Sequence, residues 1–166
     1  MDLEKAIKTA LEYETRVRDS YRTAAQKSAN DVGKRVFKVL GDEEQKHVDY
    51  LESRLAEWQK TGKVVPERLE TIVPPADVIE SGVEKLEEHL AKGDHGAEIE
   101  LLSKALQLEK ETSAFYQKMV DELDSGGELF ERFLEIERGH VAIVQAELDY
   151  VNQTGYFFDF QDFRMV

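Results

Sequence analysis

Two short motifs in the sequence pair a carboxylate with an imidazole at the same spacing. Glu44 precedes His47 by three residues in "EEQKH", and Glu137 precedes His140 by three residues in "IERGH". Side chains three residues apart lie on one face of an α-helix, so each pair can bind one cation from a single helix. Carboxylate with imidazole suits Fe, Mn or Zn, whereas an all-oxygen ligand set favours Mg or Ca. Each motif is therefore a candidate half of a metal site.

Two more glutamates, Glu14 and Glu109, fall inside apolar helical stripes, where a charge is unexpected. Buried carboxylates repel one another and lose their hydration, which costs several kcal/mol for each unpaired ion. Two divalent cations would neutralise four such carboxylates while both histidines stay uncharged. The alternative is a set of buried ion pairs in a plain helical bundle. The candidate metal ligands, called the six-residue cluster below, are Glu14, Glu44, His47, Glu109, Glu137 and His140.

An internal repeat places these residues in matching positions. The segment 11–21 matches the segment 106–116, and the segment 37–51 matches the segment 130–144, at nearly equal offsets. Each half of the chain thus supplies one Glu and one Glu-x-x-His. Such a repeat predicts a bundle with approximate two-fold symmetry, with the ligand-bearing turns meeting on the axis. By contrast, His89 and His95 lie in no such pattern, and we expect them to be exposed helix or cap residues.

Apolar residues recur at three- and four-residue spacing through most of the chain, which predicts helices rather than strands. The predicted long helices cover residues 3 to about 28, 31 to about 60, about 97 to 123, and about 128 to 152. All three prolines lie between the second and third of these, and a short helical pattern follows them at residues 78–90.

Two hairpins with short turns are therefore joined by a long crossover, at about residues 61–96, that contains a short helix. This order predicts an all-α fold, a four-helix bundle of ferritin-like connectivity. We assign residues 1–153 to this bundle and residues 154–166 to an aromatic C-terminal tail. The tail is too apolar to be left free, so we expect it to pack on its own bundle or on another subunit, and we favour a homodimer or larger homo-oligomer.

Composition limits the classes of partner. The formal net charge is -13, which disfavours nucleic acid and anionic membranes as partners, because binding them relies on clustered Lys and Arg. There is no cysteine, so a thiolate metal site and a disulfide are excluded. The amino terminus begins in a charged helical pattern and no long apolar run follows, so we expect a cytoplasmic protein.

The motifs "EYETRVRDSY" with "EEQKH" and "LEKETSAFY" with "IERGH" resemble those of the ferritin-like di-iron carboxylate superfamily. The likeness covers about residues 1–153 and is strongest to the single-domain rubrerythrin-like branch that lacks the rubredoxin domain. It implies a non-haem redox protein with two iron ions, where Mn or Zn would also suit, that reduces hydrogen peroxide or dioxygen. It further implies that Glu14 and Glu109 are terminal ligands, that Glu44 and Glu137 are bridging or shared ligands, and that each histidine binds one metal.

Two departures from that family affect the expected reaction. Full-length rubrerythrins carry a cysteine-bound iron, so electrons here are expected from an external donor such as a rubredoxin-like protein. Rubrerythrins also carry an extra Glu where this chain has Thr112. The alternatives are therefore a ferroxidase or iron-storage protein, and a non-catalytic metal-binding bundle.

Tyr21 and Tyr116 lie two helical turns after Glu14 and Glu109, respectively, on the same faces. They are either simple core aromatics or residues whose hydroxyls bond and orient the ligand carboxylates.

Overall fold

The computed structural model describes residues 2–65, 69–86, 96–123 and 127–154. The described residues form helices and connections without any strand, which confirms the all-α prediction. The helices lie where the apolar periodicity predicts them, to within a few residues. They are α1 (Leu3–Lys27), α2 (Asp31–Thr61), α3 (Ala76–Leu86), α4 (Gly96–Glu122) and α5 (Gly127–Thr154).

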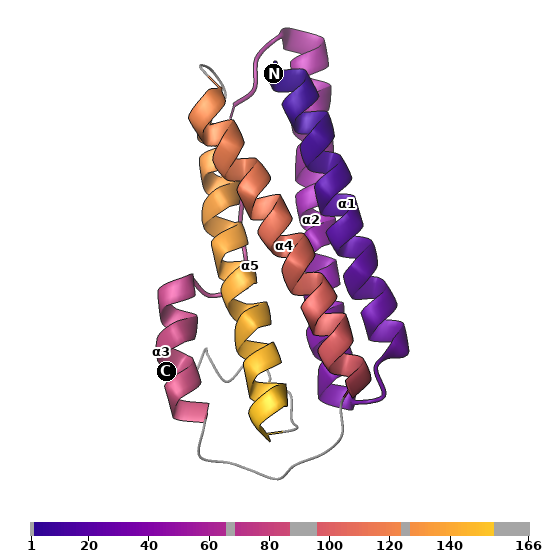
Figure 1. The fold of residues 1–166 in the computed structure, drawn as a ribbon. Coiled ribbons are helices and arrows are strands. Elements are labelled where there is room, and N and C mark those ends of the chain that lie inside the picture. The colour runs from indigo at the N-terminus through magenta and orange to yellow at the C-terminus, as the bar shows by residue number, and fades with distance from the viewer. Residues whose placement is uncertain (1, 66–68, 87–95, 124–126, 155–166) are drawn as a thin grey trace.

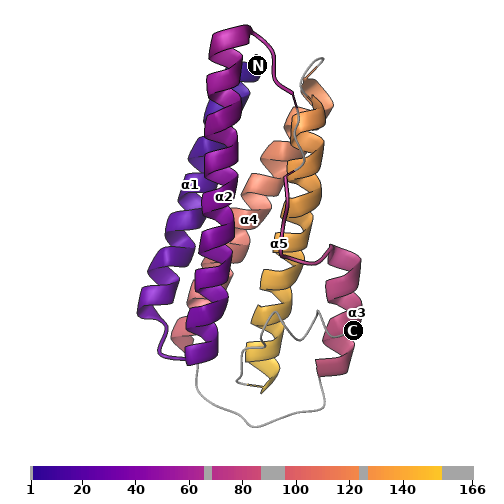
Figure 2. The same ribbon diagram turned by 180° about the vertical axis from the view of Figure 1, so that it is seen from behind.

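The four long helices lie side by side as a bundle (Figure 1). Helix α1 packs antiparallel to α2, and α4 packs antiparallel to α5. The two hairpins meet mainly through α1 and α4, while α3 packs on the outside of α5. Helix α2 ends at one end of the bundle and α4 begins at the other (Figures 1 and 2).

Local sequence signals set the helix ends of the first hairpin. The Asp2 side chain accepts a hydrogen bond from the Lys5 amide (2.8 Å), and the Asn30 side chain accepts one from the Gly33 amide (2.9 Å). Helix α2 ends at Gly62, whose φ of 69° is the left-handed conformation that glycine adopts without strain. The Glu98 carboxylate of α4 accepts from the Ala29 amide (3.2 Å), which ties the α1–α2 turn to the second hairpin.

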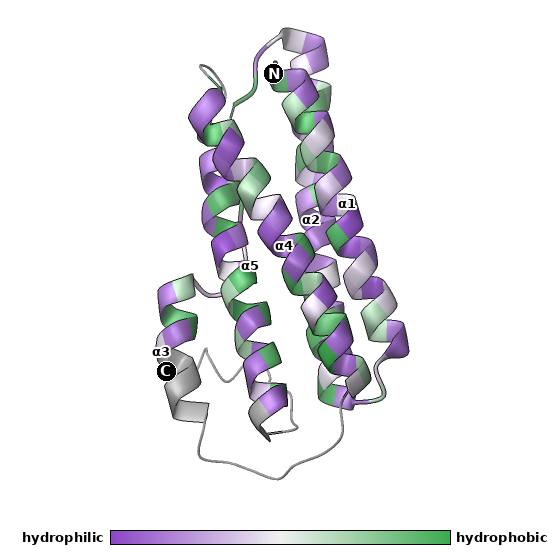
Figure 3. Cartoon of the chain, in the orientation of Figure 1, coloured by the Kyte–Doolittle hydropathy of each residue, from purple (hydrophilic) through white to green (hydrophobic). Residues whose placement is uncertain are grey.

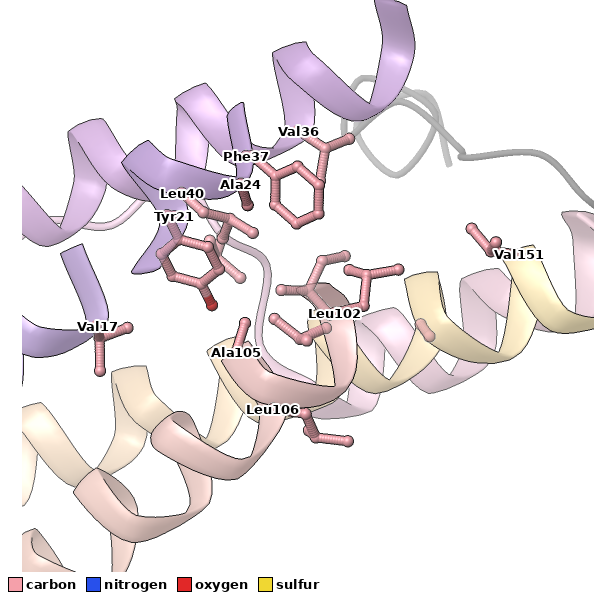
Figure 4. Close-up of a cluster of buried hydrophobic side chains, with 14 of the residues drawn as sticks. Val17, Tyr21, Ala24, Val36, Phe37, Leu40, Leu102, Ala105, Leu106 and Val151 are labelled. Carbon is pink, nitrogen blue, oxygen red and sulfur yellow. The ribbon is translucent and has the colours of Figure 1, made fainter. Parts of the chain in front are cut away.

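The core consists of two apolar clusters, one toward each end of the bundle. The first cluster includes Tyr21, Phe37 and Leu40 of the first hairpin, and Figure 4 shows these residues facing Leu102 and Ala105. The second cluster is more aromatic, and its buried rings include Phe115, Tyr116, Phe130 and Phe133. Each long helix carries both hydrophobic and hydrophilic residues (Figure 3). In an amphipathic helix the hydrophobic residues recur every three to four positions and form the face that packs in the core.

Residues 69–75, which we call the strap, precede α3 in the connection from α2 and run beside α5 (Figure 2). The Arg132 guanidinium of α5 donates to the Leu69 carbonyl (3.0 Å). At Gly139 of α5, a Cβ would lie only 3.1 Å from the Pro74 carbonyl oxygen. The strap therefore approaches the α5 backbone closely at a position where α5 carries no side chain.

Several predictions concern residues outside the described ranges. These are the placement of His89 and His95 and the packing of the aromatic tail beyond Thr154. None of the described helices combines the length and apolar character needed to cross a membrane.

Candidate metal centre

The six-residue cluster lies between the two apolar clusters, with α1 and α4 each supplying one residue and α2 and α5 two each. None of these six side chains is exposed to solvent. Glu44, His47, Glu137 and His140 each place one ligand atom within 4.8 Å of those of the other three. A buried group that could hold a metal ion is thus present, as predicted from the two Glu-x-x-His motifs.

His47 turns its Nδ1 atom toward three carboxylates. This nitrogen lies 3.3 Å from Glu44 Oε2 and 3.8 Å from Glu137 Oε1, and it lies 3.5 Å from Glu14 Oε2. The three carboxylates come from α1, α2 and α5. Helix α1 thus supplies a glutamate that belongs to the His47 side of the cluster.

His140 has the corresponding surroundings on the other side. Its Nδ1 atom lies 2.8 Å from Glu44 Oε1, 3.9 Å from Glu137 Oε1 and 3.4 Å from Glu109 Oε1. The two imidazole rings stack with centroids 5.2 Å apart and an interplanar angle of 10°. Glu44 and Glu137 therefore approach both histidines, whereas Glu14 approaches His47 and Glu109 approaches His140.

Many polar atoms of this cluster are buried without a hydrogen-bond partner among the described residues. They include both Glu137 carboxylate oxygens, both His47 ring nitrogens and one oxygen each of Glu14, Glu44 and Glu109. A buried polar atom without a partner costs about 1–3 kcal/mol, and more when it is charged. So many atoms of ligand type, facing one another in one place, are the donor set that a cation would satisfy.

The two tyrosines bond the glutamates of the opposite hairpin. The Tyr21 hydroxyl of α1 donates to Glu109 Oε1 of α4 (2.5 Å), and the Tyr116 hydroxyl of α4 donates to Glu14 Oε1 of α1 (2.6 Å). Both tyrosines are fully buried. Each hydroxyl leaves the second oxygen of its glutamate available within the cluster, so the contact orients that carboxylate.

The four buried carboxylates divide into two kinds. Burial raises the pKa of Glu44 well above 4.5, and the negative charges of Glu14 and Glu109 raise it further. Burial and the charge of Glu109 likewise raise the pKa of Glu137. Burial alone would also raise the pKa of Glu14, but hydrogen bonding with Glu44 and the charge of His47 outweigh it and lower the value to about 2. The pKa of Glu109 is lowered for the corresponding reasons by Glu137 and His140.

Both histidines hold a proton more strongly than a free imidazole. Burial acts to lower the pKa of His47, but the charges of Glu44 and Glu14 outweigh it and raise the value to about 10. The charges of Glu109 and Glu44 likewise raise the pKa of His140 well above 6.5 against the effect of burial. Without a bound cation, protons on the histidines thus offset part of the carboxylate charge.

One further residue of the site, Glu43, was missed by the sequence analysis. Its side chain is buried, with only 2% of the residue exposed, and its Oε2 atom lies 3.3 Å from His140 Nε2. The other oxygen accepts hydrogen bonds from the Thr71 hydroxyl (2.5 Å) and the Ile72 amide (2.9 Å) of the strap. Burial acts to raise the pKa of Glu43, but the His140 and Thr71 contacts lower it to about 2.

The sequence signal for Glu43 was weak because it lies beside the predicted stripe rather than within it. Residue 43 is one position before Glu44, which turns it about 100° around the helix. Its burial depends on the strap, which has no helical periodicity to predict its position. Only the adjacent "EE" in the motif hinted at a second carboxylate.

Thr112, where the resemblance to rubrerythrins would place an extra glutamate, is fully buried. Its hydroxyl donates to the Leu108 carbonyl one turn earlier in α4 (2.8 Å). The hydroxyl is therefore engaged within its own helix.

Comparisons with protein-family models, with curated proteins and with solved structures give no match to this chain. The candidate site therefore rests on the geometry of its own residues.

Proposed function

We propose that this chain is a ferritin-like, rubrerythrin-like di-iron protein that reduces hydrogen peroxide or dioxygen with electrons from an external donor. The observation that carries the proposal is the convergence of four glutamates and two histidines, all fully buried, at the centre of the bundle. Four carboxylates with one Glu-x-x-His on each of two helices is the ligand pattern of ferritin-like di-iron proteins.

The residues present fit two iron ions. The buried atoms without partners are carboxylate oxygens and imidazole nitrogens, which suit Fe(II) and Fe(III) as ligands. In the proposed ligand set, Glu14 and His47 serve one ion, Glu109 and His140 serve the other, and Glu44 and Glu137 are shared. The distances from the two histidine Nδ1 atoms favour this division, since only Glu44 and Glu137 approach both rings.

Two ferrous ions bound there would supply one electron each, which together with two protons reduces one hydrogen peroxide to two waters. The protein's own residues bind the ions and keep bulk solvent away, because the apolar clusters close the bundle above and below the site. The Tyr21 and Tyr116 hydroxyls bond the carboxylates of Glu109 and Glu14, respectively, and so fix their orientation. Complete burial of the cluster suits a small oxidant better than a bulky organic substrate.

The proposal includes the partners that the reaction needs. Return to the ferrous state requires electrons from outside, and the sequence contains no cysteine to form a rubredoxin-type relay. We therefore propose a rubredoxin-like electron donor, and a cytoplasmic homodimer or larger homo-oligomer as the working form.

Thr112 favours a second candidate, a ferroxidase that delivers oxidised iron for storage. Threonine has no carboxylate, and the Thr112 hydroxyl bonds its own helix, so position 112 supplies no additional carboxylate ligand to the cluster. The remaining ligand set, with four glutamates and two histidines, is equally that of a ferroxidase centre. Storage further requires a cage of many subunits, so the mass of the assembly in solution distinguishes the two candidates.

The first experiment is anaerobic reconstitution with Fe(II), followed by metal analysis and stopped-flow oxidation. We expect two iron ions per chain and a faster reaction with peroxide than with dioxygen. Light scattering on the same sample should give a small oligomer, whereas a cage that takes up further Fe(II) would favour storage. Fewer than one iron ion per chain would show that the proposal is wrong. Bound iron that reacts with neither peroxide nor dioxygen would instead favour a non-catalytic metal-binding bundle.

A matched pair of variants tests whether the proposed ligands hold the iron. Glu137→Gln should lower bound iron below two per chain, because a neutral amide replaces a shared carboxylate. Glu98→Gln is the control, since Glu98 is also a buried glutamate but bonds the α1–α2 turn. The control should keep the wild-type iron content.

A further inference from the structure

The two histidines differ on the side of the ring that carries Nε2, although the Nδ1 atom of each faces three cluster carboxylates. His140 Nε2 has the Glu43 carboxylate at 3.3 Å. Neither Nε2 atom has a hydrogen-bond partner among the described residues, but only His140 Nε2 has a carboxylate oxygen within ion-pair distance. The His47 ring instead packs edge-on against Phe133 with centroids 5.6 Å apart. The internal repeat explains the difference, because the residue that matches Glu43 in the second half is Ile136.

The strap holds Glu43 in place. Glu43 Oε1 accepts from the Thr71 hydroxyl and the Ile72 amide, so its Oε2 atom is directed at His140. The strap itself is fixed to α5 by the bond from Arg132 to the Leu69 carbonyl. A connection outside the four-helix repeat therefore sets the orientation of one ligand histidine and not of the other.

We propose that Glu43 is a positioning residue that makes the two metal positions unequal, so that the ion bound by His140 and Glu109 is held more tightly than the ion bound by His47 and Glu14. This inference rests on the proposed function. A carboxylate that accepts the N–H of a ligating imidazole fixes its tautomer and ring orientation and raises its basicity, which strengthens the bond to the metal. Glu43 is also a fifth carboxylate next to the cluster, and it lies on the His140 side.

The test is a titration of the metal-free protein with Co(II) in competition with a chromophoric chelator. The wild type should bind two ions in resolved steps, and Glu43→Gln should weaken the tighter step ~10- to 100-fold, the usual cost of losing such a carboxylate. The other step should change less than about threefold. Glu98→Gln, the buried-glutamate control used above, should leave both steps unchanged.

Single-position backgrounds assign the affected step. In Glu14→Ala, which keeps the His140 position intact, adding Glu43→Gln should lower Co(II) affinity ~10- to 100-fold. In Glu109→Ala, which keeps the His47 position, the same addition should have little effect. An equal loss in both backgrounds, or no loss in either, would overturn the inference while leaving a two-metal site in place.

A milder variant covers the case in which Glu43→Gln does not fold. Thr71→Val removes one hydrogen bond to Glu43 from the strap and should weaken the same step by a smaller factor, whereas an unchanged step there would count against the inference. If the wild type binds less than one Co(II) per chain, the proposed di-metal function fails and the inference with it. The same titration therefore distinguishes failure of the proposed di-metal function from failure of the proposed role of Glu43.

Discussion

Two buried tyrosines connect the two hairpins at the site. Tyr21 and Tyr116 each donate to a glutamate of the opposite hairpin, so each hydroxyl joins α1 to α4 through one buried hydrogen bond. Burial, followed by the charge of the bonded glutamate, raises the pKa of both phenols well above 10. Both hydroxyls thus remain protonated donors at neutral pH.

Replacing either tyrosine should destabilise the metal-free protein. Tyr21→Phe or Tyr116→Phe removes a buried hydrogen bond to a carboxylate, and we expect the free energy of unfolding to fall by about 1.5–3 kcal/mol. Urea unfolding followed by circular dichroism measures the change.

The matched control is Tyr13→Phe, since Tyr13 is half-buried against Phe115 and its hydroxyl has no hydrogen-bond partner in the described part of the chain. It should change the unfolding free energy by less than about 0.5 kcal/mol. Equal effects of Tyr13→Phe and Tyr116→Phe would mean that the buried hydroxyl bond adds nothing to stability.

Among the elements, the strap adds a feature that the helical repeat lacks. It carries Thr71 and Ile72 to Glu43 on α2 and places the Pro74 carbonyl against Gly139 on α5. At Gly139 the backbone of the strap leaves little room for a larger side chain. Gly41 on α2 offers a comparison, because a Cβ there would meet its nearest neighbour, Tyr21 Cβ, at an ordinary 3.5 Å.

The two glycines should respond differently to alanine. In a helix interior, alanine is favoured over glycine by about 1 kcal/mol, so Gly41→Ala should stabilise the protein by up to that amount. Gly139→Ala should gain less or lose stability, because its Cβ would press on the Pro74 carbonyl at 3.1 Å. Thermal unfolding of both variants makes the comparison. An equal gain from the two changes would show that the strap yields freely at this point.

For the molecule as a whole, the site couples metal binding to protonation. The six-residue cluster holds four carboxylates and two histidines that are fully buried, and the pKa values of both histidines are raised. For His47 the folded-state value of about 10 exceeds the ordinary 6.5, so its ion pairs stabilise the metal-free protein fully below pH 6.5. That contribution is lost as the pH rises toward 10.

Metal binding should therefore release protons at neutral pH. A histidine must be neutral to bind a metal, so the ion displaces the proton that each imidazole holds in the metal-free protein. We expect at least two protons released per chain at saturation, because Glu44 and Glu137, whose pKa values are also raised, must lose any proton they hold in order to bind the metal. The metal affinity should fall as the pH is lowered. Calorimetry of Zn(II) binding in two buffers with different ionisation enthalpies measures the number. Binding without proton release would contradict the raised histidine pKa values.

The sequence by itself determined the helices and the six candidate ligands. Helical periodicity and the three-residue spacing of Glu-x-x-His are local properties, so they can be read without knowing how the helices pack. The repeat then related the two hairpins, and the long crossover accounted for α4 beginning at the far end of the bundle.

The tertiary structure alone decided the contacts that cross between elements. The sequence could not pair Tyr21 with Glu109 rather than Glu14, because that choice depends on how α1 and α4 meet. It also could not bury Glu43, since a residue beside the apolar stripe becomes buried only when a non-helical segment covers it. Long-range packing, which has no fixed period along the chain, thus set the difference between the two halves of an otherwise repeated site.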